Sequence, residues 1–435
     1  MAKTIEHRMT TRRSVLFGAG AAGSALAAGL TRGQAAEKQG EQVTDAPVSD
    51  RTQERQAFHG VHQAGIVTPR PAAGMIASFH VLAKTPDEVE RLFKILSQRI
   101  AFLMKGGQTP VLDDKLPPAD SGILGPDVPP DNLTVTVSLG ASFFDQREWL
   151  LPHKPARLSR MTAFRNDALD ADLCHGDLAL QICANTPDTN IHALRDILKN
   201  LPDLMVLRWK QEGSVPVLPP KSNGTHETAR NFLGFRDGTA NPDGNDPALM
   251  DRLVWVQRGG DEPDWAAGGS YQAVRIIRNF VERWDRTPLG EQERIIGRRK
   301  ASGAPLGGKE EFDVPDHAKD ADGTVTPLDA HIRLANRRVH GSDAHLVLRR
   351  PFNYSNGVSK SGQLEQGLLF ICYQADLEKG FITVQKQLDG EPLEEYIKPI
   401  GGGFFFTPPG PLDETDFVGR TLLEATGHAV TRINL

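Results

Sequence analysis

Two stretches of the chain end an apolar run with the same three residues, Thr-Pro-Asp, and they constrain the fold more than any other feature. The stretch 83–87 follows the apolar run 74–82, and the stretch 184–188 follows the run 177–183. Threonine is a favourable helix N-cap, and proline suits the first helical position. Each junction therefore predicts that a strand ends and a helix begins.

The segments after these junctions have helical periodicity. We expect helices at about 86–105 and 187–200, and Thr85 and Glu88 have the spacing of a capping box. In the first helix the apolar residues recur at intervals near 3.6, at Val89, Leu92, Phe93, Leu96, Ile100 and Leu103. With further strand-like runs at 133–139 and 204–209, the order is strand, helix, strand, strand, helix, strand. That order predicts a ferredoxin-like unit, which we place at 70–215.

The rest of the chain, 216–435, repeats this order less clearly. We expect helical segments from the first of its strands to about Arg299 and at 377–388, and strands at 271–277, 345–348, 367–374 and 402–407. The sequence therefore predicts an α+β protein with two tandem ferredoxin-like units. The connections 211–250 and 300–345 are long, and loops of such length in a compact protein are usually functional or disordered.

The N-terminus has the features of an export signal. Arg12 and Arg13 directly precede the apolar run Val15–Leu30, which is too short and too weakly apolar to span a membrane. Small residues follow near Ala36, as at a cleavage site, and the paired arginines favour the twin-arginine route. We predict a signal peptide over 1–36, a flexible polar leader over 37–69, and a mature protein in the periplasm.

Charge and cysteine content exclude several classes of protein. The net charge is −5, and because residues 1–36 carry +4, their removal leaves −9. An acidic chain is a poor partner for nucleic acid, and no later stretch reaches transmembrane length. Cys174, Cys183 and Cys372 form no C-x-x-C pair and no C-x-x-C-H motif, which excludes covalent c-type haem attachment.

Three stretches could carry chemistry. In Gly234–Pro242, turn signals surround Asp237, so the stretch is either an ordinary tight turn or a loop that presents a carboxylate to a pocket. His331 lies in a partly apolar run and is either a core or surface histidine or the axial ligand of a metal. Arg349 and Arg350 follow the apolar run 346–348, and they either end it at solvent or place a fixed positive charge in a cavity.

Taken together, these stretches resemble the dye-decolourising peroxidase family. Gly234–Pro242 resembles its GxxDG signature, and other elements follow in the family's order over essentially the whole mature chain. They are the twin-arginine start, His331 within His-Ile-Arg-Leu-Ala-Asn, Arg349-Arg350, Gly367–Phe370 and the tail from Leu377 through Lys398–Gly403 to Phe406. The resemblance is closest to the secreted deferrochelatase/peroxidase branch, found with bacterial iron-uptake systems. The chain departs from the family at Arg337, where proline is usual, and at Pro351, where glycine is usual.

The resemblance implies a fold of the dimeric α+β barrel superfamily, with one non-covalent haem b in the C-terminal half. It assigns His331 as the proximal ligand of the haem iron, Asp237 as the distal acid–base group and Arg349 as the distal arginine. Asp329 is a candidate partner for the His331 ring. Three further residues are candidates for the wall of the haem pocket: Arg333, Leu368 and Phe370.

The implied activity is reduction of hydrogen peroxide with oxidation of dyes or small phenolic-type reductants. Bulky reductants would deliver electrons through surface-linked aromatic residues such as Trp255, Trp265, Trp284 or Tyr373. A second expectation is the release of iron from haem with the porphyrin left intact, in service of a bacterial iron-uptake system. The alternative is a non-catalytic periplasmic haem carrier, while a non-haem metalloenzyme lacks the necessary HExxH spacing. We expect a homo-oligomer, most simply a dimer, and an acidic pH optimum.

Overall fold

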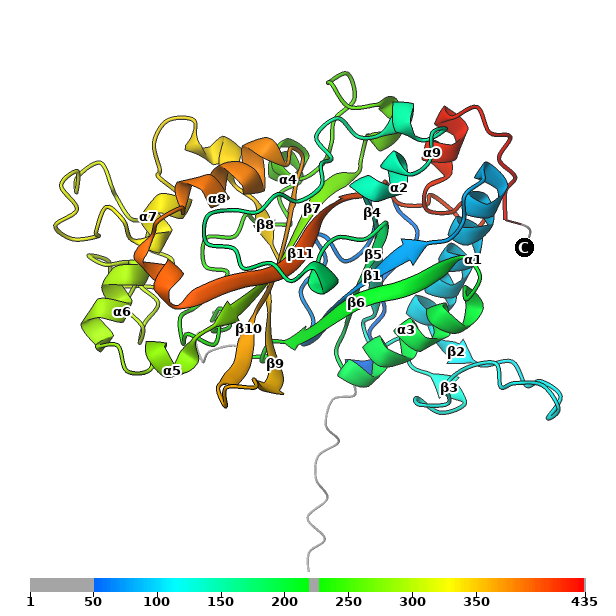
Figure 1. Ribbon diagram of the computed structural model, residues 1–435, viewed down its shortest axis with the longest axis horizontal. Coiled ribbons are helices and arrows are strands. Elements are labelled where there is room, and N and C mark those ends of the chain that lie inside the picture. The colour runs from blue at the N-terminus through cyan, green and yellow to red at the C-terminus, as the bar shows by residue number, and fades with distance from the viewer. Residues whose placement is uncertain (1–50, 219–226, 434–435) are drawn as a thin grey trace, which may run out of the picture. The chain divides into compact units, whose positions relative to one another are not determined.

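The computed structural model describes residues 51–218 and 227–433 (Figure 1). The predicted signal peptide, 1–36, lies outside these residues. The prediction of a flexible leader as far as residue 69 is wrong for its last part, because Phe58 and Ile66 are buried. The Gln63 amide also donates to the carbonyl oxygens of Val137, at 3.0 Å, and Pro408, at 2.9 Å. This segment is therefore part of the folded body.

The first half of the protein contains the ferredoxin-like unit that the Thr-Pro-Asp junctions predict. Its antiparallel sheet has the order β4-β5-β1-β6. The elements are β1 (Ala73–Val81), α1 (Pro86–Lys105), β4 (Thr134–Gly140), β5 (Leu178–Ala184), α3 (Pro187–Asn200) and β6 (Met205–Ser214). Both helices have the predicted bounds, and the capping box of Thr85 and Glu88 is present. Thr186 differs, since its hydroxyl donates instead to the Asp131 carboxylate at 2.6 Å.

The second half forms a similar sheet in the order β11-β7-β10-β9. Its strands are β7 (Ser270–Asn279), β9 (Phe352–Val358), β10 (Leu364–Gln374) and β11 (Ile397–Thr407), with the two-residue β8 (Leu348–Arg349) at one edge. The predicted strand at 345–348 has the wrong bounds, because residues 342–345 form a 3₁₀ turn and the strand β8 covers only Leu348–Arg349. The strand β9, which also pairs with β10, was not predicted. Sequence patterns do not predict β9, because its outer half, Ser355–Val358, is exposed and carries no apolar run.

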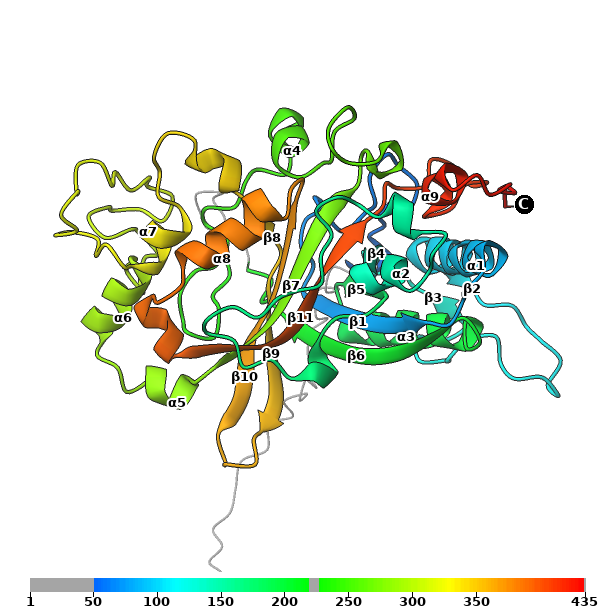
Figure 2. The same ribbon diagram turned by 45° about the horizontal axis from the view of Figure 1, so that its top comes forward.

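The two sheets close into one barrel. β11 pairs with β4, β6 pairs with β9, and β7 pairs with β10, so eight strands form a continuous ring (Figures 1 and 2). Strands from both halves contribute to one buried cluster, which includes Ile76, Cys183, Ile276, Leu369 and Tyr373. Because its members come from all around the ring, this cluster is the interior of the barrel.

The outer faces of the two units are covered differently. In the first unit, α1 has 20 residues and α3 has 14, and both pack their buried sides into one large apolar core. In the second unit the helices have only four to eight residues: α5 (Val281–Trp284), α6 (Leu289–Ile296), α7 (His331–Ala335) and α8 (Thr383–Gln387) (Figure 2). Short helices and long loops fill the space over this sheet less completely, and the cavity described below lies there.

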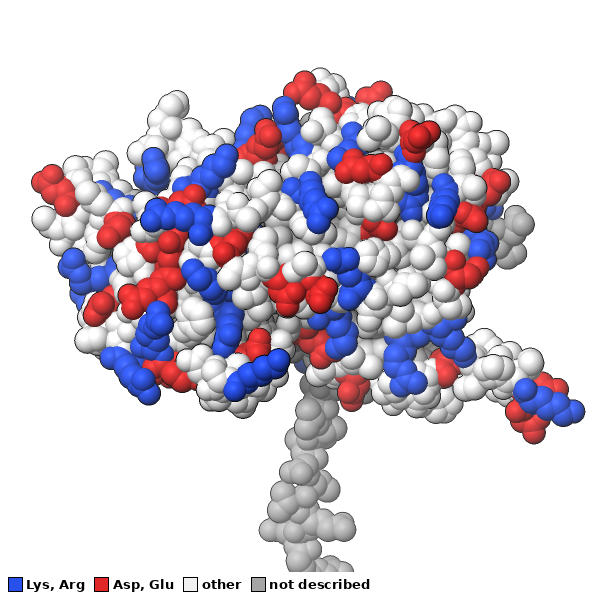
Figure 3. Space-filling model, in the orientation of Figure 1, with Lys and Arg blue, Asp and Glu red and all other residues white. Residues whose placement is uncertain are grey.

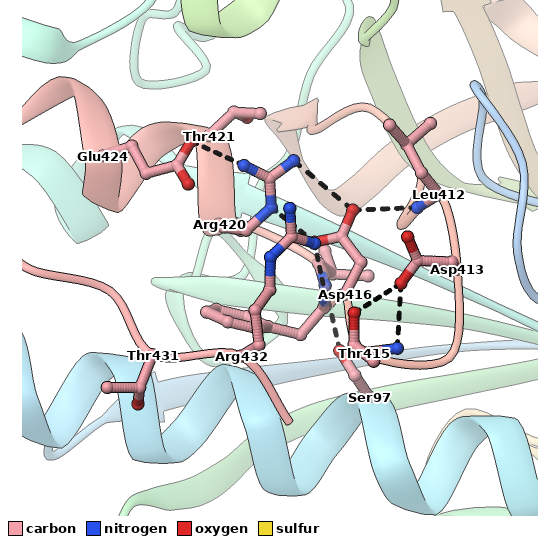
Figure 4. Close-up of polar contacts among 12 residues, drawn as sticks. Ser97, Leu412, Asp413, Thr415, Asp416, Arg420, Thr421, Glu424, Thr431 and Arg432 are labelled. Carbon is pink, nitrogen blue, oxygen red and sulfur yellow. Dashed lines mark hydrogen bonds and ion pairs between the residues drawn. The ribbon is translucent and has the colours of Figure 1, made fainter. Parts of the chain in front are cut away.

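The C-terminal segment is tied to α1 by a polar network (Figure 4). The Asp416 carboxylate accepts hydrogen bonds from the Leu412 backbone N–H at 2.9 Å and from Arg420 of α9 (Arg420–Ala425) at 2.6 Å. The hydroxyl oxygen of Ser97 on α1 accepts from the backbone N–H of Val418 at 3.0 Å. Nearby, Glu90 lies 2.6 Å from Lys94 and accepts from the Thr431 backbone N–H. These contacts fix the end of the chain to the first unit.

Among the residues that the structure describes, no helix combines the length and apolar character needed to cross a membrane.

On the face drawn in Figure 3, acidic and basic side chains are interspersed rather than separated into large regions of one sign. The remaining α-helices are α2 (Ala141–Asp145) and α4 (Pro247–Leu253), and the remaining strands are the paired β2 (Gly107–Gln108) and β3 (Asp127–Val128).

Candidate active site

A cavity in the C-terminal half lies between the outer face of the β11-β7-β10 sheet and the short helices that cover it. On β10 the side chains alternate, so Leu369 and Ile371 pack into the barrel while Leu368 and Phe370 line the cavity. Further apolar residues complete the wall, among them Leu233, Phe235, Ile277, Ile296, Val347 and Phe381. Leu368 and Phe370, the two apolar candidates for the wall of a haem pocket, thus both line this cavity.

His331 begins α7, and its ring is held by a buried carboxylate. Its Nδ1 lies 2.7 Å from Oε2 of Glu391, which is only 4% exposed, whereas the His331 side chain is 33% exposed and lines the cavity. Burial acts to lower the pKa of His331, but the charge of Glu391 and its hydrogen bond outweigh burial, so the pKa is raised. The ring is therefore fixed through Nδ1 by Glu391, an arrangement that suits metal coordination through the other nitrogen, Nε2.

The partner suggested from the sequence, Asp329, is the wrong carboxylate. Asp329 is exposed at the surface, and the ring is bonded to Glu391, which lies 60 residues further along the chain. Glu391 follows the turn after α8 and precedes β11, so the fold brings it beneath α7. No local sequence pattern connects the two residues.

Asp237 and Arg349 form an ion pair on the wall of the same cavity. Nη1 of Arg349 lies 2.9 Å from Oδ1 of Asp237, and both side chains line the cavity with His331. The turn after Asp237 needs glycine, because Gly238 has a φ of +126°. The adjacent Arg350 points the other way and donates to the backbone oxygen of Ile66, so only the first arginine of the pair enters the cavity.

The loop that carries Asp237 is bound to the long segment preceding His331. Arg236 forms ion pairs with Glu227, at 2.9 Å, and with Glu311, at 3.0 Å. The other oxygen of Glu311 accepts a hydrogen bond from the hydroxyl of Thr239 at 3.0 Å. Sequence reasoning missed Glu311, because one acidic residue in a long polar loop carries no distinguishing signal.

Arg333 does not line the cavity, so its assignment to the pocket is wrong. In a helix, two residues correspond to a rotation of about 200°, which directs Arg333 away from the side occupied by His331. Its guanidinium instead donates to the Asp320 carboxylate at 3.1 Å and to the backbone oxygen of Thr326 at 2.8 Å. Besides Arg349, the arginines that line the cavity are Arg236, Arg275, Arg298 and Arg338.

The two departures from the family pattern lie outside the lining of the cavity. Arg337 is exposed, and the backbone oxygen of Pro351 accepts a hydrogen bond from Arg70. Neither side chain lines the cavity.

Of the four aromatic residues proposed for electron transfer, Trp284 packs against residues of the cavity wall. Its indole N–H donates to the backbone oxygen of Leu233 at 2.8 Å, and its ring centroid lies 6.0 Å from that of Phe235. Trp255 and Trp265 belong to other clusters, and Tyr373 lies inside the barrel. None of the four lines the cavity itself.

All three cysteines are free and buried. Burial raises the pKa of Cys183 to about 11 and also raises those of Cys174 and Cys372. Buried thiols with raised pKa values are poor nucleophiles and poor metal ligands, so they are structural side chains.

The residues around the cavity fit a haem. A tetrapyrrole needs apolar walls, and the His331 imidazole, backed by Glu391, is a side chain that would hold its iron. The carboxylates of a haem need cations, and the cavity has several arginines besides the one paired with Asp237. Asp237 and Arg349 add an acid–base group and a fixed positive charge.

Comparisons with known proteins agree with this geometry. The family model described as Dyp-type peroxidase, N-terminal, matches residues 63–214, and the model described as Dyp-type peroxidase, C-terminal, matches residues 228–412. The chain is 54% identical over 416 residues to the protein named Deferrochelatase of Yersinia pseudotuberculosis, covering 95% of each chain. It is 55% identical over 414 residues to the Deferrochelatase of Shigella sonnei, covering 95% of this chain and 97% of that one.

Solved structures of peroxidases also resemble the structure of this chain. A DyP-type peroxidase from Streptomyces coelicolor superposes with a TM-score of 0.78 at 35% identity, and it covers 87% of this chain and 100% of its own. The ferric form of DtpA from Streptomyces lividans gives a TM-score of 0.77 at 35% identity, with the same coverage. The chain therefore belongs to the Dyp-type peroxidase family, and it is an enzyme, a peroxidase that uses one non-covalently bound haem.

Proposed function

We propose that His331 binds the haem iron in this cavity and that Asp237 and Arg349 are the groups that act on hydrogen peroxide. The observation that carries this proposal is that one cavity holds both an imidazole fixed through Nδ1 by Glu391 and the Asp237–Arg349 ion pair. A carboxylate behind the imidazole makes it a stronger electron donor to a bound metal. When bound, the haem supplies the redox chemistry.

Each residue then has a definite role. To break the O–O bond, peroxide must lose a proton from one oxygen and gain a proton on the oxygen that leaves. The Asp237 carboxylate moves that proton between the two oxygens, and the Arg349 guanidinium stabilises the negative charge that develops as the bond breaks. Leu368 and Phe370 keep water from the walls of the cavity, which strengthens both interactions.

We further propose that the protein releases iron from haem and leaves the porphyrin intact. This proposal is supported by the identity of 54–55% to proteins named Deferrochelatase, over nearly the full length of both chains. In this reaction haem is the substrate. Release of the iron as a ferrous ion from ferric haem takes one electron from an external reductant, and two protons must then replace the ion on the ring nitrogens. Asp237 is an acidic group of the cavity able to deliver these protons one after the other, taking each from solvent. A non-catalytic haem carrier is not favoured, because the two peroxidase models together match both halves of the chain.

Product analysis tests which reactions the protein performs. Haem-loaded protein is incubated under a reductant, with and without hydrogen peroxide, and the extracted pigment is examined by mass spectrometry and fluorescence. Iron-free porphyrin with an unbroken ring supports iron release. Oxidation of a phenolic reductant that requires peroxide, with haem recovered unchanged, supports a peroxidase alone. Neither product, in protein that binds haem, would contradict both activities.

We also propose that the protein reaches the periplasm by the twin-arginine route and serves an iron-uptake system there. Support comes from the paired Arg12 and Arg13 before an apolar run, which lie outside the described residues. Fractionation of cells that produce the full chain, with Arg12→Lys and Arg13→Lys as the matched variant, tests the route. The mature protein should be periplasmic for the natural sequence and remain in the cytoplasm in the double variant.

A further inference from the structure

The residue Asn241 holds the backbone of Arg349 through its side-chain amide. Its Oδ1 accepts a hydrogen bond from the backbone N–H of Arg349 at 2.8 Å, and its Nδ2 donates to the backbone oxygen of the same residue at 3.0 Å. One side chain therefore satisfies both backbone groups of Arg349. Asn241 lies only four residues after Asp237, on the same loop.

The edge position of β8 explains why Arg349 needs such a partner. β8 is the last strand in the sheet order, and Arg350 donates its backbone N–H to Ile371 of β10 at 2.8 Å. Backbone groups of successive residues in an antiparallel strand point to opposite sides, so those of Arg349 face the open edge. No strand of the described residues pairs with that edge, and the carboxamide of Asn241 takes the place of one.

The chemistry of the contact selects asparagine. A carboxamide presents one acceptor and two donors, which match the N–H and C=O of a single residue. An aspartate would face the Arg349 carbonyl with a second acceptor, and an alanine would leave both backbone groups unpaired. The side chain of Arg349 meanwhile pairs with Asp237. The loop 237–241 thus holds Arg349 twice, because Asn241 bonds to its backbone and Asp237 to its guanidinium.

We propose that Asn241 is a positioning residue that fixes the Arg349 guanidinium relative to the Asp237 carboxylate for the reaction with peroxide. The inference rests on the proposed roles of Asp237 and Arg349. It goes beyond them because Asn241 does not line the cavity and acts through the backbone of Arg349. Misplacement of a catalytic group by about 1 Å can cost about a hundredfold in rate.

The first test measures the contact itself by amide hydrogen exchange in haem-loaded protein, resolved at Arg349. In Asn241→Ala the Arg349 amide should exchange about tenfold faster or more, because its acceptor is gone. In Asn241→Asp, which keeps that acceptor, exchange should stay within about threefold of the natural protein. Asn245→Ala is the matched control, since Asn245 is exposed and its side chain donates to the Asp243 carboxylate. Unchanged exchange in Asn241→Ala would overturn the inference.

The second test is a double-mutant cycle on the second-order rate constant for hydrogen peroxide, measured by stopped flow. Asn241→Ala should slow the reaction about tenfold to a hundredfold in the natural protein, but less than about twofold when Arg349→Leu is already present. Equal slowing in both backgrounds would overturn the inference, since the effect would then not pass through Arg349. If Arg349→Leu alone left the rate unchanged, the proposed catalytic role of Arg349 would fail, and with it the positioning role of Asn241.

Discussion

Replacing Glu391 by glutamine tests the arrangement around His331 most quantitatively. Glu391 lies 2.7 Å from Nδ1 of His331 and is almost completely buried, so Glu391→Gln removes a charge without removing the hydrogen-bond acceptor. A hydrogen bond to a charged group contributes about 1.5–3 kcal/mol and one between neutral groups about 0.5–1.5 kcal/mol. The substitution should therefore cost about 1–1.5 kcal/mol of interaction with the imidazole.

That difference predicts two measurable changes in the haem-loaded protein. The carboxylate favours ferric over ferrous iron through the imidazole, so its loss should raise the midpoint potential, by about 40–65 mV at 59 mV per tenfold change. Haem affinity should fall about tenfold, within the range known for groups behind metal ligands. The assays are a spectroelectrochemical titration and a haem titration of the haem-free protein.

The matched control is Glu395→Gln, the same change at a side chain that is 62% exposed and four residues further along the chain. It should alter neither quantity. An unchanged potential and an unchanged haem affinity in Glu391→Gln would refute the reasoning, because Glu391 would then not act on the ligand of the iron.

The remaining predictions concern the other parts of the structure. Asp237→Asn should slow the reaction with peroxide about 10²–10⁴-fold in stopped-flow measurements. Turnover of the natural protein should be greatest at acidic pH, and a rate that rises steadily into the alkaline range would count against Asp237 as the acid–base group. Arg333→Leu should leave haem affinity within about twofold in a haem titration, because its guanidinium is bonded to Asp320 outside the cavity; a tenfold loss would return Arg333 to the pocket. Glu90→Gln should lower the free energy of unfolding of the haem-free protein by about 2 kcal/mol at pH 7 in urea. Burial acts to raise the pKa of Glu90, but contacts with Lys94 and the C-terminal segment outweigh it and lower the pKa from 4.5 to about 2. The stabilisation by Glu90 is therefore complete above about pH 4.5 and is lost as the pH falls towards 2. An equal stability difference at pH 7 and pH 2.5 would contradict this prediction.

The sequence predicted the first ferredoxin-like unit well because its signals are local. The Thr-Pro-Asp junctions and the 3.6-residue periodicity place both ends of α1 and α3, since capping and amphipathic packing act within one turn of the helix. In the second unit the helices are short and the strand β9 is half exposed, so the same patterns were weak and β9 was not predicted.

For the site, the sequence predicted the individual residues that stand in recognisable motifs, but not the residues that support them. Asp237, His331 and Arg349 could be proposed from their sequence settings, and the fold brings all three to one cavity. Their supporting residues could not be found, because Glu391 and Glu311 come from distant segments and meet the site only through the tertiary structure. Arg333 was misplaced because proximity in sequence to His331 does not set the direction of a side chain on a helix.

The most direct test of the central claim is the absorption spectrum of the purified protein with haem supplied, recorded beside His331→Ala. The natural protein should show the spectrum of a ferric haem with an axial imidazole, and the variant should lose that spectrum or show one with a changed axial ligand. If the natural protein bound no haem, or if the variant bound it with an identical spectrum, His331 would not be the ligand and the assignment of the cavity would be contradicted.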